Sequence, residues 1–248
     1  MISIRDLHYS YPDGTLALRG VTLDVAAGEF LAVCGPNGSG KTTLIRHMNG
    51  LLTPRTGSVV VDGYDTVQAP QEVIRRVGMV FQDADSQILG ETVWEDVAFG
   101  PRNLRLNRDV LEERVASALK AVNLTDLAQK PCHLLSGGEK RRVAIAGVLA
   151  MRSPVIIFDE PFANLDYPGV REVLQHLLRL REQGHTLIVT THDVEKVVAH
   201  VDRLAVLFNG ELRAVGHPEE VIPHLRAFEV RPPCFTYFGE RMLSWLTD

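Results

Sequence analysis

The chain has 248 residues, of which 45% are hydrophobic, enough for one large α/β domain or for one domain with a small appendage. The formal charge, 26 basic minus 31 acidic residues or −5, gives no support for a nucleic-acid partner, because surfaces that bind nucleic acid are normally basic. The three cysteines are few, odd in number and far apart, which argues against a disulfide framework or a zinc site and favours a reducing cytosol.

Two half-buried strands are predicted near the N-terminus. Residues 2–7 and 21–25 alternate apolar with polar side chains, and Pro12, Asp13 and Gly14 predict a turn between them. The first residues lack the basic-then-apolar pattern of a signal peptide, and no apolar run approaches the roughly 20 residues that span a bilayer. We therefore expect any membrane role to depend on a partner.

A phosphate-binding loop is predicted directly after the next strand. Residues 30–34 are continuously apolar, as in a buried parallel strand, and residues 41–49 predict a helix with Gly50 at its C′ position. The G-x-x-x-x-G-K-[ST] pattern between them consists of Gly35, Pro36, Asn37, Gly38, Ser39, Gly40, Lys41 and Thr42. Backbone N–H groups and the helix dipole favour phosphate there, with Lys41 near the β/γ-phosphates, Thr42 suited to Mg²⁺ and Thr43 to an α-phosphate.

The middle of the chain predicts a helical insertion within an α/β fold. Strands are expected at 58–61 and 77–81, and helical spacing then dominates from about residue 87 to residue 150. The clearest helix covers 110–122, with Asn107 or Asp109 as its N-cap.

A second candidate anion site lies near the end of this insertion. Ser136 is a good N-cap for a helix over 140–151, and its hydroxyl with the N–H groups of Gly137 and Gly138 could bind an anion. Helix capping alone is the simpler alternative for this segment.

An acidic pair follows the next predicted strand, at 155–158. Ligands of open α/β sheets lie beyond the carboxyl ends of the strands, so Asp159 could hold Mg²⁺ through water and Glu160 could orient or deprotonate an attacking water. Without a phosphate loop nearby, such a pair is more often a surface turn.

We next expect a helix over 170–183, a strand over 186–190 and a hairpin with an Asn209-Gly210 turn. The alternation of strands and helices predicts a mostly parallel sheet.

Three further residues have both a functional and a structural interpretation. Gln82, after a predicted strand, could bond Mg²⁺ or a lytic water, although glutamines at strand ends are mostly surface residues. His192, also after a strand, could donate to a γ-phosphate or be an ordinary packed or exposed residue. For Tyr11, stacking on adenine is what the family resemblance given next implies, and we favour it; the alternative is core packing with Tyr9, two residues earlier on one strand face.

Taken together, about residues 1–220 resemble the ATP-binding-cassette (ABC) family, in motif order and approximate spacing. The matching motifs are an aromatic residue at Tyr11, a Walker A loop at 35–42, Gln82, a signature at Leu135, Ser136, Gly137, Gly138 and Glu139, a Walker B strand at 155–160, a D-loop at 163–166 that contains Asp166, and a switch histidine at His192. The resemblance implies a P-loop NTPase fold with a mostly parallel core sheet, an N-terminal antiparallel β portion and a helical insertion. It also implies that two subunits enclose MgATP, the signature of each contacting the γ-phosphate bound by the other.

Segments 80–87, 92–103 and 140–151 resemble the energy-coupling-factor importers of cobalt, nickel and vitamins. This implies an ATPase on the cytoplasmic side of the membrane that drives a transmembrane coupling protein and a substrate-binding membrane subunit. The cargo could be cobalt, nickel, biotin or another vitamin. The ATPase subunits could form either a homodimer or a heterodimer. The chain departs from the family at Phe162-Ala163-Asn164 and at Tyr167, which precedes Pro168.

The resemblance to the ABC family implies an ATP-binding domain at 1–227, with a helical subdomain at about 87–150, and a tail at 228–248. The tail could cover an apolar edge or support a dimer contact through its aromatic residues, Phe235, Tyr237, Phe238 and Trp245.

Part of 87–103 could form a groove for a helix of the membrane partner. The alternative is that its apolar residues, Ile88, Leu89, Val93, Trp94, Val97 and Phe99, are all buried.

Rival functions also follow from the sequence. A non-transport ABC ATPase of translation or DNA repair usually has tandem cassettes or long coiled coils, and this chain shows neither. An ABC importer of a different class stays an alternative. A module that binds nucleotide without hydrolysing it is disfavoured, because Lys41, Asp159, Glu160 and His192 are intact.

Overall fold

An antiparallel sheet forms the N-terminal part of the computed structural model, which describes residues 1–238 and 242–246. Its strand order is β2-β1-β4-β5, and its strands are β1 (Ile2–Ser10), β2 (Leu16–Val25), β4 (Thr56–Val61) and β5 (Tyr64–Asp65). This confirms the predicted antiparallel portion. The first two strands extend further toward the Pro12-Gly14 turn than the alternating pattern alone indicates.

The second sheet is the mostly parallel sheet that the sequence predicts, in the order β10-β9-β3-β8-β7-β6. Its strands are β3 (Phe30–Cys34), β6 (Val77–Val80), β7 (Val155–Asp159), β8 (Thr186–Thr191), β9 (Arg203–Phe208) and β10 (Glu211–Gly216). Only β10 pairs antiparallel, with β9, and the turn between them places both Asn209 and Gly210 at positive φ, as the Asn-Gly pair predicts.

Alternate residues of the core strands face two separate cores. Leu31 and Val33 of β3 face helix α1 (Lys41–Met48) and the antiparallel sheet, whereas Phe30 and Ala32 face the helices on the other side. Both faces of the sheet are therefore covered, which explains why the strand sequence is continuously apolar instead of alternating. Burial on both faces fixes β3, and with it the loop that follows.

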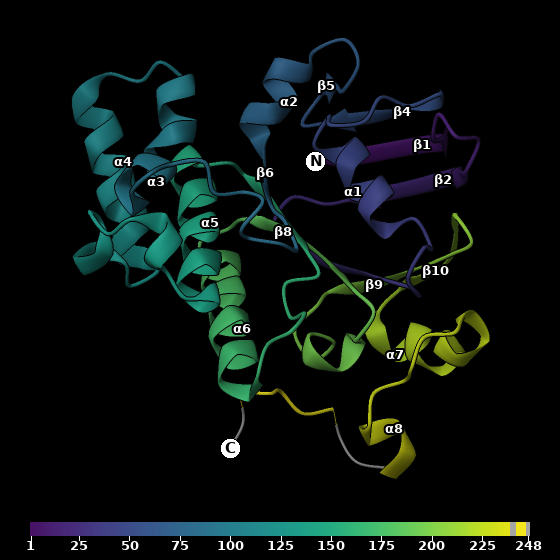
Figure 1. The fold of residues 1–248 in the computed structure, drawn as a ribbon. Coiled ribbons are helices and arrows are strands. Elements are labelled where there is room, and N and C mark those ends of the chain that lie inside the picture. The colour runs from purple at the N-terminus through teal and green to yellow at the C-terminus, as the bar shows by residue number, and fades with distance from the viewer. Residues whose placement is uncertain (239–241, 247–248) are drawn as a thin grey trace.

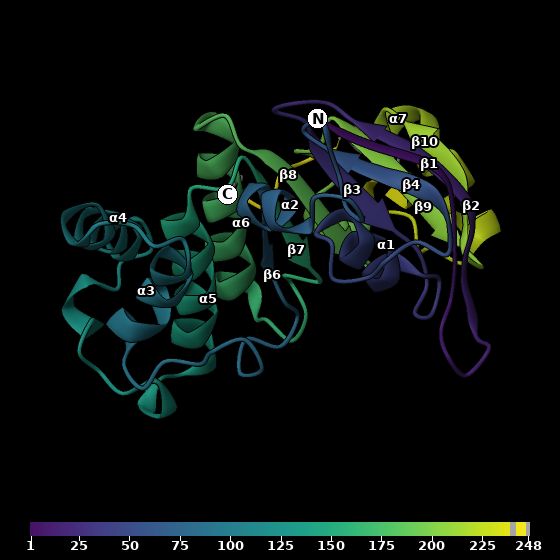
Figure 2. The ribbon, with the colours of Figure 1, turned by 90° about the horizontal axis from the view of Figure 1, so that it is seen from above.

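Helices α3 (Val93–Asn103), α4 (Arg108–Ala121) and α5 (Gly137–Met151) gather beside the β6 edge of the core sheet, away from the antiparallel sheet (Figures 1 and 2). Helix α6 (Tyr167–Glu182) lies beside α5, whereas α2 (Pro70–Arg76) contacts β5 and buries Val73 in the core on the side of the antiparallel sheet. The N-cap of α4 is Asn107, whose side chain accepts from the Val110 N–H, and the predicted alternative, Asp109, lies inside the helix. Within the described residues, no helix combines the length and apolar character needed to cross a membrane.

Several expected helix boundaries differ from the structure; α5, for example, begins at Gly137, directly after its Ser136 cap, instead of at residue 140. Residues 87–92 form a loop, so the helical insertion begins at Val93, where Thr92 and Glu95 make a capping box. Helix α6 begins three residues before the predicted start, because the Asp166 side chain accepts from the Gly169 N–H and Pro168 favours the first turn.

The C-terminal tail packs against the core of its own chain. It contains a short helix, α8 (Phe235–Phe238). The side chains of Phe235 and Trp245 contact the core that lies between the parallel sheet and helices α3 to α6. The Trp245 ring lies 5.5 Å from that of Tyr167, while Tyr237 is half exposed. The side chain of Phe238 lies outside the described residues. These contacts favour the first of the two expectations, that the tail covers an apolar edge.

Candidate nucleotide site

The phosphate-loop pattern lies between β3 and α1, and the close packing around two of its glycines, Gly35 and Gly40, leaves no room for a side chain. A Cβ on Gly35 would stand 2.1 Å from the Leu207 carbonyl oxygen, and one on Gly40, whose φ is +106°, would stand 2.7 Å from that of Ala17. The N–H groups of residues 40–43 have no hydrogen-bond acceptor among the described residues. The loop therefore presents free donors at a helix N-terminus, where the helix dipole favours an anion.

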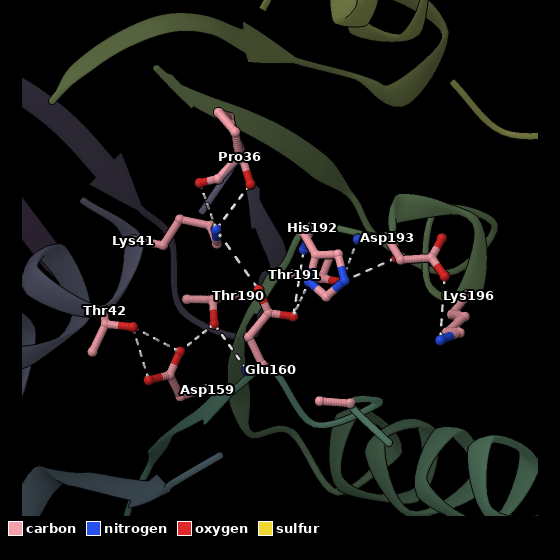
Figure 3. A network of polar contacts seen from close by, with 12 residues as sticks. Pro36, Lys41, Thr42, Asp159, Glu160, Thr190, Thr191, His192, Asp193 and Lys196 are labelled. Atoms are coloured by element: carbon pink, nitrogen blue, oxygen red, sulfur yellow. Dashed lines mark hydrogen bonds and ion pairs between the residues drawn. The ribbon is translucent and has the colours of Figure 1, made fainter. Parts of the chain in front are cut away.

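Lys41 is buried at the same loop. Its Nζ donates to the carbonyl oxygens of Gly35, at 2.8 Å, and Pro36, at 3.1 Å, and lies 3.7 Å from Glu160 Oε1 (Figure 3). Its side chain is 7% exposed. A buried ammonium with two carbonyl partners and one carboxylate can exchange them for the oxygens of a bound phosphate.

Asp159, at the end of β7, joins two threonine hydroxyls from neighbouring elements. Thr42 Oγ1 donates to its Oδ2 at 3.1 Å and its Oδ1 at 3.3 Å, and Thr190 Oγ1 donates to Oδ1 at 2.6 Å. Asp159 is 6% exposed. The result is a buried set of oxygen atoms beside the phosphate loop, which is the ligand chemistry that Mg²⁺ prefers.

Glu160 occupies a backbone conformation that few residues adopt, with φ at +47°. Its N–H donates to the Thr190 carbonyl oxygen at 3.2 Å and to Thr190 Oγ1 at 3.0 Å, and these bonds hold the turn against β8. Its Oε2 accepts from the His192 N–H and lies 2.9 Å from His192 Nδ1. Because a carboxylate can only accept, Nδ1 is the donor, and Glu160 orients the half-exposed His192 ring.

A cavity of about 360 Å³ runs along these groups. Its lining includes the phosphate loop, Gln82, Glu160, His192 and Tyr11. The Tyr11 hydroxyl bonds Thr43 Oγ1 at 2.9 Å, whereas Tyr9 packs against the core near the antiparallel sheet. The rings of Tyr9 and Tyr11 meet edge-on, with centroids 5.2 Å apart, but only Tyr11 lines the cavity. The cavity thus brings together Tyr11, Lys41, Glu160, His192 and the exposed Gln82.

His47 supports this region from inside α1. It is fully buried, and its Nδ1 donates to the Thr43 carbonyl oxygen at 2.8 Å, since a carbonyl can only accept. The Tyr9 ring packs against it edge-on, with ring centroids 4.7 Å apart. Burial lowers the pKa of His47 below its ordinary value.

The signature segment lies apart from this cavity. None of residues 135–139 lines it, nor the neighbouring cavity of about 220 Å³ around Glu160 and the D-loop. Ser136 is the N-cap of α5: its Oγ accepts from the Glu139 N–H, and the Glu139 carboxylate accepts from the Ser136 N–H. That backbone bond lowers the Glu139 pKa. Leu135 is buried, while Ser136, Gly137 and Gly138 are exposed.

Asp166, in the predicted D-loop, caps α6 in this structure and is not brought to the phosphate loop. A functional residue that the sequence pattern missed is Thr190, which bonds both acidic residues. Threonine inside an apolar strand is ordinarily a β-former. Its role follows only from the β7–β8 register, which pairs Thr190 with Asp159.

Comparisons with known proteins show the family of this chain. Residues 18–163 match the family model described as ABC transporter. The chain is 48% identical over 224 residues to the energy-coupling factor transporter ATP-binding protein EcfA of Methanothermobacter thermautotrophicus, covering 89% of this chain and 72% of that protein. It is 44% identical over 239 residues to the cobalt import ATP-binding protein CbiO of Rhodobacter capsulatus, covering 94% and 85%.

Solved structures show the same fold. CbiO1 from Clostridium perfringens, part of the ABC transporter complex CbiONQ, superposes with a TM-score of 0.82 at 37% identity, covering 96% of this chain and 98% of that one. The cassette MJ0796, solved as a dimer in a post-hydrolysis state with ADP and Pi, gives a TM-score of 0.78 at 30% identity, covering 88% and 99%. The chain therefore belongs to the ABC transporter family, as an ATP-binding ATPase subunit of the energy-coupling-factor and cobalt-import type.

Proposed function

We propose that two copies of this subunit, or this subunit and a related one, close head-to-tail around two MgATP and power import through membrane proteins. The observation that carries the proposal is the separation of the two phosphate-reading segments. The signature is exposed at the start of α5 and lines neither cavity around Lys41 and Glu160. A second subunit can supply it, and the dimeric cassette MJ0796 bound to ADP and Pi supports that arrangement.

The residues around the cavity would divide the work of ATP hydrolysis. The free N–H groups of the loop and Lys41 bind the β- and γ-phosphates, and Tyr11 stacks on the adenine. Glu160 accepts a proton from the attacking water, and His192, oriented by Glu160, donates to the γ-phosphate. Gln82 orients the same water from the strand end of β6, and Asp166 contacts the second subunit.

Thr42 and Asp159 would hold Mg²⁺, with Gln82 at its edge. The hydroxyl and carboxylate already lie 3.1 Å apart in a buried setting, and both are hard oxygen donors. Among the described residues, no group of three or more His, Cys, Asp or Glu side chains is placed so that it could hold a metal ion. When bound, Mg²⁺ neutralises charge that develops on the transferring phosphoryl group.

A groove between α2, α3 and α5 is the proposed docking site for a helix of the membrane partner. It encloses about 750 Å³, and three of its apolar lining residues are half exposed or more: Ile74, Leu89 and Phe99. The alternative that all six apolar residues of 87–103 are buried is wrong, because Leu89 and Phe99 are 68% and 49% exposed. Val93 and Val97 are fully buried in the core, and Ile88 and Trp94 are partly buried against it.

The membrane partners are proposed to be a transmembrane coupling protein and a substrate-binding subunit, which would hold this ATPase at the cytoplasmic face. CbiO1 is part of the ABC transporter complex CbiONQ, and the EcfA and CbiO names indicate energy coupling and cobalt import in those proteins. The proposed cargo is a cobalt or nickel ion, or a vitamin such as biotin.

The central test uses the Glu160→Gln variant. Loss of the carboxylate should lower turnover by about 10²–10⁴-fold and leave ATP binding intact, so that the closed dimer accumulates in MgATP. Light scattering with MgATP and with MgADP measures the dimer. A variant that turns over normally, or that stays monomeric with MgATP beside its membrane partners, would refute the proposal. Co-purification of the membrane subunits and mass analysis of the bound solute would then identify the cargo.

A further inference from the structure

Arg141 connects the helix that begins with the signature to the turn that follows Glu160. Its side chain leaves α5 one turn after Ser136 and donates from Nη1 to the Pro161 carbonyl oxygen at 2.5 Å. Nη2 lies 3.4 Å from the Ala163 carbonyl oxygen. The planar guanidinium thus spans two carbonyls of one turn, a geometry that a single ammonium group cannot reproduce.

The carbonyl oxygens of Pro161 and Ala163 are the hydrogen-bond partners of Arg141 among the described residues. No described carboxylate lies within ion-pair distance of Arg141, whereas its neighbour Arg142 pairs with Glu172 of α6 at 2.8 Å. Arg141 is about half buried, and this burial lowers its pKa. A desolvated arginine that bonds only main-chain oxygens acts on the backbone conformation of that turn.

The turn itself needs such support. Glu160 and Asn164, at its two ends, both have positive φ, at +47° and +58°, and non-glycine residues reach these values at a cost in strain. Within the turn, the Ala163 N–H donates to the Glu160 carbonyl oxygen at 3.1 Å. Pro161 has no N–H to contribute. Side-chain donors from α5 therefore complete the bonding of this segment.

We propose that Arg141 is a positioning residue for Glu160, holding the turn so that the Glu160 carboxylate faces the cavity beside Lys41. The inference rests on the proposed function and extends it. The start of α5 would contact the nucleotide of the second subunit, while Arg141 fixes the catalytic carboxylate of its own subunit. One helix would then connect the two nucleotide sites of the dimer.

The test compares Arg141→Gln with Arg142→Gln, a matched change one residue along the same helix. For Arg141→Gln we expect kcat to fall by about ten- to a hundredfold, as for a misplaced catalytic group, with the KM for ATP changed by less than about twofold. Arg142→Gln should retain most of the wild-type kcat, with an unfolding temperature near that of Arg141→Gln. Equal kcat for both variants, or a change confined to KM, would overturn the assignment.

Two further measurements test the positioning role of Arg141 if Arg141→Gln folds poorly. Arg141→Lys keeps the charge and most of the side-chain length but not the fork, so its kcat should be intermediate; a wild-type kcat would contradict the role of the two carbonyl bonds. In a Glu160→Gln background, Arg141→Gln should lower the residual turnover by less than about twofold, because the group it positions is already absent. A full additive loss would overturn the inference. Dimer trapping by Glu160→Gln alone tests the proposed function separately.

Discussion

The two phosphate-reading segments of this chain differ in how far one subunit completes them. Lys41, Asp159 and Glu160 are 6%, 6% and 8% exposed. Hydrogen bonds and the Lys41–Glu160 ion pair connect them with the phosphate loop, the start of α1 and the ends of β7 and β8. Ser136, Gly137 and Gly138 are exposed, and their bonds are those of a helix cap. The difference teaches that the sheet builds one half of the site in a single chain, while the other half has no role in that chain beyond starting a helix.

Substitution of the buried lysine should produce the largest effect. Lys41→Ala removes the cation that bonds the loop carbonyls and faces Glu160, so we expect ATP turnover to fall by at least about 10²–10³-fold. Steady-state ATPase rates would measure this. The control is Lys120→Ala, an exposed residue of α4. Wild-type turnover in Lys41→Ala would show that the buried half is not the catalytic half.

Two substitutions of Ser136 separate helix capping from phosphate contact. Ser136→Asp retains a good N-cap, so the unfolding temperature should stay close to wild type, but its charge would repel a phosphate from the second subunit. We expect ATP-dependent dimerisation and turnover to be lost. Ser136→Ala should destabilise the fold by about 1 kcal/mol through loss of the cap. If Ser136→Asp dimerises and hydrolyses ATP normally, the segment is a cap and nothing more.

The groove between α2, α3 and α5 predicts a smaller effect, on assembly. Leu89→Asp and Phe99→Asp place a charge at residues that are 68% and 49% exposed, so folding should be little affected while docking of an apolar helix is weakened. Co-purification with the membrane subunits measures the change. Leu51→Asp, at a residue 56% exposed outside the groove, is the matched control. Equal recovery of the complex with all three variants would rule out this docking site.

The smallest effect concerns pH and the helix behind the phosphate loop. Burial lowers the folded-state pKa of His47 below its unfolded value of about 6.5, so the unfolded chain takes up the proton first as pH falls. Stability should be complete above about pH 6.5 and decrease below it, by up to about 1.4 kcal/mol per pH unit for this group. Urea unfolding at pH 7.5 and 5.5 measures the loss. His47→Gln should reduce the slope, and an unchanged slope would contradict this account.

Local sequence signals predicted the buried half of the site well. The limits of β3 are those expected, because an apolar run covered on both faces and a glycine loop mark its two ends. The Asn209-Gly210 hairpin follows equally from local turn chemistry. The apolar pattern predicts a start of α6 that is three residues too late, because the cap Asp166 and the first-turn residue Pro168 lie outside that pattern.

Contacts between distant segments could not be predicted in the same way. Thr190 reaches Asp159 only because β7 and β8 are neighbours in a particular register, and Arg141 reaches Pro161 only because α5 crosses that turn. Helical periodicity likewise does not tell which apolar residues of 87–103 face the core. The structure buries Val93 and Val97 and leaves Leu89 and Phe99 exposed.

The capping box at Ser136 has a consequence for the free energy of subunit association. Its oxygen accepts from the Glu139 N–H through a lone pair, which leaves the hydroxyl hydrogen available and restricts the directions in which it can point. Rotational freedom of that side chain is thus already reduced when α5 folds, before any encounter. A phosphate arriving on a second subunit would meet a preorganised donor, so little entropy remains to be lost on closure.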